Sequence, residues 1–261
     1  MKTLFLTSFC ILALLVGAVP AQPGKPAAAK PQTAPPYEMP MSVKTLSNGM
    51  QIIVTPDHSV PLVTLEIAVR NGSFTEPPEL NGLSHLYEHM FFRTNHATAL
   101  WQCEHMEFSN QALFKASGCE NEMALKDQIG DVGYQAGLED MGVAYNGETH
   151  EEVVEYYYNT TSPYLVPSLK ALKDAIRYPK FDEEEFNSEK QAVIGELDRN
   201  FSNPYGHIND DLLEHLFYKY PTRKKPEGTR ETVAAATTDQ MRLIQSRYYV
   251  PNNTVLVVSG D

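Results

Sequence analysis

The stretch that decides both fold and site is "HLYEHMFF", residues 85–92. His85 and His89 are four positions apart, so on a helix they lie on one face and both imidazoles can reach one ion. Glu88 stands beside the second histidine, where a general base for a metal-bound water belongs. The alternative is an ordinary helix whose outer face carries these polar residues. The stretch therefore predicts a helix that is either a solvated surface or half of a metal site.

A segment further along the chain offers the missing ligand. A catalytic zinc site takes three protein ligands and keeps one position open. Asp182 is a good cap for a helix over residues 183–201, and early glutamates suit the positive end of its dipole. Apolar neighbours of Glu196 predict that this part of the helix packs on the core. Glu189 lies two turns earlier on nearly the same face.

Strand signals precede and follow the histidine stretch. Asn48-Gly49 in "VKTLSNGMQIIVTPD" predicts a hairpin. Residues 62–69 alternate, with one clearly apolar side, which predicts a third strand. Residues 142–160 predict two more strands around a polar turn, and "NTVLVVSGD" predicts a strand at 253–261.

Helical spacing is clearest at residues 163–177, and further helices are expected near 209–218 and 238–247. The region from Thr94 to about Gly133 is expected to be less regular. Hairpin-like pairs of strands followed by runs of helices predict an α+β fold, a mostly antiparallel sheet with helices packed on one face.

The first forty residues are expected to stand apart from this domain. Lys2, an apolar run and Val19-Pro20-Ala21 predict a cleaved signal peptide at residues 1–21, and hence a secreted or periplasmic protein. A membrane anchor is the alternative, but the run is short for a bilayer span. No other stretch is long enough to span, so we expect no membrane partner after cleavage. Residues 22–40 are rich in Pro and Ala and predict a linker.

The composition suits a globular protein and argues against nucleic acid as a partner. The chain has 261 residues, of which 42% are hydrophobic and 21% charged. Removing residues 1–21 takes away one positive charge, Lys2, so the formal net charge changes from −12 to −13. A chain this acidic repels phosphate backbones.

Two cysteines remain after signal cleavage, Cys103 and Cys119. In an oxidising compartment a disulfide between them is the default interpretation. A metal cluster of Cys103, His105 and Cys119 is the alternative, although it lacks a fourth ligand at the usual spacing.

The motifs resemble those of one known family. H-x-x-E-H is the inverted zinc motif of the pitrilysin and insulinase peptidases, which include the mitochondrial processing peptidase. "GSFTEPPELNGLSHLYEHMFF" resembles the family's strand, turn and helix, and "NSEKQAVIGELD" is similar to its second glutamate segment. "GVAYNGETHEEVVEYYY" resembles the strand beside the active site. Residues 220–261 resemble the end of the family's first domain, so we expect a zinc peptidase N-terminal domain over 41–261.

The resemblance implies roles for individual residues. One zinc ion would be bound by His85, His89 and Glu196, while Glu88 activates water and Glu189 supports the site from behind. Asn146 takes the family's substrate-binding asparagine position, and Tyr156 takes its tyrosine position. Peptide or protein substrate would lie extended along an edge strand near residues 143–147.

Two departures from the family pattern shape the functional hypotheses. The segment between His89 and Glu196 is roughly 30 residues longer than usual, which predicts an insertion near residues 96–132. The family's later domain supplies an Arg and a Tyr that have no counterpart here, so we expect a second peptidase-like domain or subunit as partner. The leading hypothesis is an exported zinc metalloendopeptidase domain. The alternative is a peptidase-like binding or scaffold subunit that needs a partner domain for activity.

Overall fold

The structure is a computed structural model that describes residues 39–108, 110–137, 140–219 and 225–261. The predicted signal peptide and nearly all of the predicted linker lie outside the described residues. Within the described ranges, no helix is both long and apolar enough to cross a membrane.

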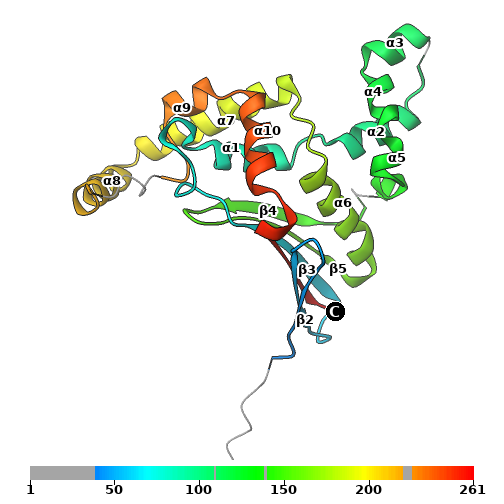
Figure 1. Cartoon of the computed structure of the whole chain (residues 1–261), viewed down its shortest axis with the longest axis horizontal. Helices are drawn as coiled ribbons and strands as arrows, with labels where there is room; N and C mark the ends of the chain where they lie inside the picture. Colours follow the sequence, from blue (N-terminus) through cyan, green and yellow to red (C-terminus); the bar gives the residue numbers. More distant parts are fainter. Residues whose placement is uncertain (1–38, 109, 138–139, 220–224) are drawn as a thin grey trace, which may run out of the picture. The chain divides into compact units, whose positions relative to one another are not determined.

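One six-stranded sheet organises the domain, in the order β1-β2-β6-β3-β5-β4 (Figure 1). Neighbouring strands are antiparallel except β2 and β6, which are parallel. Because β4 is last in this order, it is an edge strand. The strands are β1 (Ser42–Thr45), β2 (Gln51–Pro56), β3 (Leu62–Val69), β4 (Ala144–Thr149), β5 (Val154–Thr161) and β6 (Thr254–Gly260).

Each predicted strand is present, and so is the first hairpin. β1 and β2 pair antiparallel around Asn48-Gly49, where Gly49 has a φ of 90°. A side chain there would be strained, and a Cβ would lie 2.7 Å from Cβ of Asn252. The hairpin therefore depends on glycine for both its turn and its packing.

Helices cover one face of the sheet, as the sequence predicts. On β3, Val63, Leu65, Ile67 and Val69 are buried, while the residues between them are partly exposed. The buried side faces α1, α6 and α10 (Figure 1). The α-helices are α1 (Leu83–Phe91), α2 (His96–His105), α3 (Gln111–Ala116), α4 (Cys119–Ala124), α5 (Lys126–Ile129), α6 (Leu165–Arg177), α7 (Glu183–Phe201), α8 (Pro204–Leu216), α9 (Arg230–Ala235) and α10 (Thr238–Tyr248). The 3-10 helices are η1 (Pro78–Leu80), η2 (Gly133–Gly137), η3 (Ser162–Tyr164) and η4 (Pro251–Asn253).

The prediction of a less regular region after Thr94 is wrong. This segment folds into the short helices α2 to α5. Most of these helices have six residues or fewer, too few for a clear apolar period. A Cys103–Cys119 disulfide joins α2 to α4. The two sulfur atoms are thus bonded to each other, which removes the alternative of a Cys103-His105-Cys119 metal cluster. Helix α9 is the other α-helix among the described residues that the sequence pattern missed.

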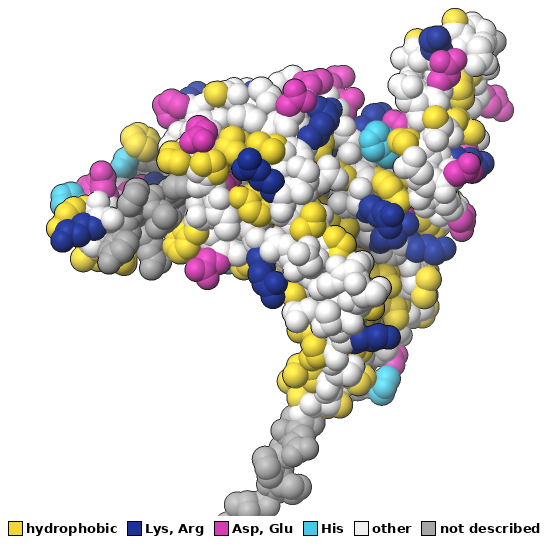
Figure 2. Space-filling model, in the orientation of Figure 1, with side chains coloured by type: hydrophobic (Ala, Val, Ile, Leu, Met, Phe, Trp, Pro, Cys, Tyr) yellow, Lys and Arg dark blue, Asp and Glu magenta, His cyan; other side chains and the backbone are white. Residues whose placement is uncertain are grey.

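Helix α8 carries an exposed apolar stripe. It begins at Pro204, five residues before the predicted start, and none of its residues is buried. Tyr205, Ile208, Leu212 and Leu216 follow helical spacing and are all exposed, Tyr205 to 82%. Figure 2 shows hydrophobic side chains over the end of the domain that carries α8.

Candidate metal centre

The histidine-bearing helix α1 begins at a buried carboxylate. Glu76 accepts hydrogen bonds from the backbone N–H groups of Gly82 at 2.9 Å and Ser84 at 2.6 Å. These N–H groups have no partner within a helix, and a negative charge at this end also suits the helix dipole. Gly82 has a φ of 89°, and a Cβ there would lie 2.6 Å from the carbonyl oxygen of Glu227. The start of α1 is therefore fixed before the motif begins.

Replacing Glu76 with alanine is expected to lower the free energy of unfolding by about 2–4 kcal/mol, because two buried N–H groups lose their acceptor. Chemical denaturation followed by circular dichroism measures the change. The exposed Glu79 provides the matched control, and its alanine variant should stay within about 0.5 kcal/mol of wild type. Equal effects of the two substitutions would show that Glu76 does not anchor α1.

Helix α1 divides its residues between the core and the candidate site. Leu83, Leu86, Tyr87 and Met90 are buried in one apolar cluster with residues of α7 and α10. The side chains of His85 and His89 are 13% and 18% exposed. Burial of the apolar stripe therefore sets the direction in which the two imidazoles face.

Helix α7 supplies two carboxylates to the same place. The side chain of Asp182 accepts hydrogen bonds from the backbone N–H groups of Glu184 and Glu185, as predicted for its cap. Buried Phe186 and Val193 then pack α7 on the core. Moving along α1, His85 lies near Glu196, whereas His89 also contacts Glu189, so the two helices run antiparallel here.

The ligand atoms are close enough to share one ion. Oε2 of Glu196 lies 3.7 Å from Nε2 of His85 and 3.6 Å from Nε2 of His89. Ligand atoms about 2.1 Å from one tetrahedral zinc ion lie roughly 3.4 Å apart. Two imidazole nitrogens and a carboxylate oxygen are also the donor set of many catalytic zinc sites. The residues present thus fit a zinc ion.

The two histidines are prepared for metal binding in different ways. Burial, with a smaller contribution from the nearby His89, lowers the pKa of His85 to about 4. The ring is therefore neutral near pH 7, which is the form that binds metals. Nδ1 of His89 lies 3.0 Å from Oε2 of Glu189. A proton on that nitrogen leaves Nε2 unprotonated, so that its lone pair is available to a metal ion.

Glu88 is held by the edge strand β4. Burial raises the pKa of its carboxyl group, while the hydrogen bond from Thr149 and the nearby His89 act in the opposite direction. The hydroxyl of Thr149 donates to Oε2 of Glu88 at 2.7 Å. Gly147 leaves room for this side chain, since a Cβ there would lie 2.8 Å from Cγ of Glu88. A raised pKa makes a carboxyl group better able to hold a proton that it has accepted, as a general base must.

Tyr156 and Asn146 lie on the strands below α1. Tyr156 is buried, stacks on Phe91 at 3.8 Å between ring centroids, and bonds to the hydroxyl of Tyr249. It supports α1 from the sheet. Asn146 is exposed on β4, and the strand's alternation places it on the opposite face from Gly147 and Thr149. Its role in substrate binding stays a prediction.

Two residues that contact the proposed base and the supporting glutamate were not predicted from the sequence. Thr149 bonds to Glu88, and the guanidinium of Arg93 pairs with Glu189. Thr149 shares a strand face with Gly147, which a strand assignment can reveal once α1 is known to cross it. Arg93 follows directly after the motif, but its partner is distant in sequence, so no local signal identifies the pair.

The chain resembles known proteins in both sequence and fold. The family model described as insulinase (peptidase family M16) matches residues 51–107 and 103–230. An uncharacterised zinc protease of Bacillus subtilis, YmxG, is 25% identical over 217 residues, which are 83% of this chain and 46% of YmxG. The chain thus spans about half the length of the curated relatives it matches.

Two solved structures share the fold. A protease from Helicobacter pylori has a TM-score of 0.64 at 21% identity, with 86% of this chain and 47% of that chain covered. An inactive M16 domain from Pseudomonas fluorescens has a TM-score of 0.66 at 16% identity, with 85% and 47% covered. The fold is therefore found in a protease and in a domain named inactive. Because the family model matches well over half of its residues, the chain belongs to the insulinase family, peptidase family M16.

Proposed function

We propose that this chain is the metal-binding domain of an exported zinc metalloendopeptidase that hydrolyses peptide bonds with zinc-activated water. The observation that carries the proposal is the convergence of His85, His89 and Glu196, whose ligand atoms all lie within 4.8 Å of one another. Glu88 stands next to this group and is held in place by Thr149. Export rests on the signal-like residues 1–21 alone.

The proposed chemistry divides between the ion and Glu88. When bound, zinc supplies a Lewis acid that polarises water and the peptide carbonyl. Glu88 accepts a proton from the attacking water and then passes it to the departing amine. Thr149 holds Oε2 of Glu88, so we assign the proton transfer to Oε1. Burial of the carboxyl group favours its protonated state between the two steps.

The edge strand β4 is the proposed docking strand for substrate. One edge of β4 pairs with β5, and among the described residues no strand pairs with its opposite edge. An extended peptide can add to such an edge through backbone hydrogen bonds. Gly147 and Thr149 on β4 face Glu88, so a peptide on this edge lies close to the proposed base.

A second peptidase-like domain or subunit is the proposed partner. The relatives named above are about twice as long as the segment they share with this chain. The alternative function, a binding or scaffold subunit, is favoured by one observation, the inactive-domain name of a structural neighbour. Size-exclusion chromatography and cleavage assays with and without the partner separate the two. Cleavage by the isolated monomer excludes the scaffold role.

Metal removal tests the proposal directly. The purified protein is expected to contain about one zinc per chain, held by His85, His89 and Glu196. Peptide cleavage should be lost when a chelator removes the ion, because nothing then polarises the water and the peptide carbonyl. Elemental analysis and a fluorogenic peptide assay measure both quantities. Re-adding zinc should restore cleavage. A protein that binds no zinc after dialysis against excess metal would overturn the proposal.

A further inference from the structure

The carboxylate of Glu189 lies buried between α1 and α7, with only 5% of its side chain exposed. A buried carboxylate is costly unless both oxygens find partners. Here Oε2 lies 3.0 Å from Nδ1 of His89, and Oε1 pairs with the guanidinium of Arg93. The carboxylate of Glu189 thus connects the candidate metal ligand His89 to the positive charge of Arg93.

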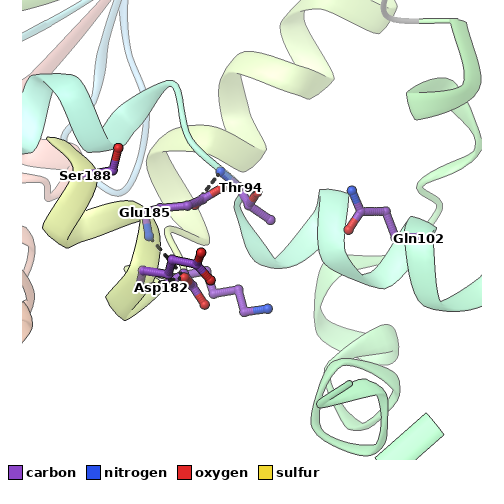
Figure 3. Close-up of a pocket in the computed structure, with 7 residues that line it drawn as sticks. Thr94, Gln102, Asp182, Glu185 and Ser188 are labelled. Atoms are coloured by element: carbon purple, nitrogen blue, oxygen red, sulfur yellow. Dashed lines mark hydrogen bonds between the residues drawn. The ribbon is translucent and has the colours of Figure 1, made fainter. Parts of the chain in front are cut away.

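The loop that carries Arg93 is fixed to α7 at two successive turns. The backbone N–H of Arg93 donates to the carbonyl of Met90 at 3.1 Å, just after α1 ends. The next residue, Thr94, donates to Glu185 from its backbone N–H at 3.2 Å and from its hydroxyl at 2.6 Å (Figure 3). Glu185 precedes Glu189 by about one helical turn. The position of Arg93 is therefore set by hydrogen bonds on both sides.

We infer that Arg93 is a positioning residue for the metal ligand His89, acting through Glu189. The inference rests on the proposed zinc site. Arg93 holds Oε1, which fixes the orientation of the carboxylate and directs Oε2 at Nδ1 of His89. The Nδ1–H then donates to Glu189, and the lone pair of Nε2 is left for the proposed zinc ion, which Oε2 of Glu196, 3.6 Å from Nε2, would also bind.

The unequal exposure of the pair separates this role from an ordinary surface ion pair. The side chain of Arg93 is 48% exposed, whereas that of Glu189 is 5% exposed. Exposed pairs contribute little to stability. By contrast, Glu189 can turn away from His89 only by leaving its place between the helices, and Arg93 opposes that turn. Arginine suits this task because its planar donors hold a carboxylate in one orientation.

Zinc affinity of Arg93 variants tests the inference without any need for catalysis. Competition with a fluorescent chelator should show that Arg93→Ala binds zinc about 10- to 100-fold more weakly than wild type. Arg93→Lys should recover part of the loss, because it restores the charge without the planar fork. The matched control is Arg230→Ala, which removes an exposed pair between Arg230 and Asp198 of the same helix α7. It should bind zinc as wild type does.

A second measurement keeps this inference separate from the proposed function. In metal-free protein, at a pH at which ¹⁵N NMR shows the His89 ring to be neutral, the spectra should show mainly the Nδ1–H tautomer in wild type and a mixture of tautomers in Arg93→Ala. Failure of wild type to bind zinc would overturn the proposed function, while the tautomer still decides the role of Arg93. Zinc affinity within about twofold of wild type, or an unchanged tautomer in folded Arg93→Ala, would overturn the inference.

Discussion

Replacing Glu88 with glutamine should lower kcat/KM for peptide cleavage by about 100- to 10,000-fold while zinc stays bound. Glutamine keeps the size of the side chain and can still accept the hydrogen bond that Thr149 donates to Glu88. It cannot accept a proton from water, so the expected loss falls on the chemical step. Initial rates with a fluorogenic peptide, together with zinc content, measure the two effects separately.

Glu151 provides the control for this substitution. It is an exposed glutamate just beyond β4, and its glutamine variant changes the same charge without touching the proposed site. The Glu151→Gln variant should keep the activity of wild type. Cleavage by zinc-loaded Glu88→Gln at the wild-type rate would remove Glu88 from the mechanism.

The second large effect is expected for Glu196→Ala, which should weaken zinc binding by at least about 100-fold. Loss of groups that merely support a ligand costs 10- to 100-fold, and loss of a ligand should cost no less. The side chain of Glu196 is 35% exposed, so folding of the metal-free protein should change little. Isothermal titration with zinc, beside unfolding curves of the metal-free variants, separates metal binding from stability.

Asp198→Asn is the matched control for Glu196→Ala. Asp198 lies two residues further along α7, and its side chain is 59% exposed. The variant should keep wild-type zinc affinity. Equal zinc affinity of wild type and Glu196→Ala would mean that the third ligand is another residue, and the metal site proposed here would be wrong.

Local patterns in the sequence predicted the parts of the site that depend on neighbouring residues. The four-residue interval between His85 and His89 fixes a shared helix face, and the structure places both side chains there. The cap at Asp182 and the apolar face of β3 follow from equally local rules. Glu196 needed the family resemblance as well, because its approach to α1 depends on how two distant helices pack.

Contacts between distant segments set the limit of sequence reasoning. Thr149 meets Glu88 only because β4 passes beneath α1, and Arg93 meets Glu189 only because α1 and α7 run antiparallel. Neither pair has a characteristic spacing along the chain. The helices of the 94–133 region escaped prediction for a different reason, since a disulfide and a small separate apolar cluster stabilise elements too short to show a period.

Thr149 and Gly147 bring β4, the proposed docking strand for substrate, into contact with the proposed base Glu88. If substrate adds to the edge of this strand, the proposed base and the peptide bond to be cut share one mechanical support. Glu88 itself belongs to α1, but Thr149 of β4 donates to its carboxylate, so a displacement of the strand moves the docked peptide and this hydroxyl donor together. The hydroxyl that orients the proposed base therefore follows the docked peptide when the sheet edge moves.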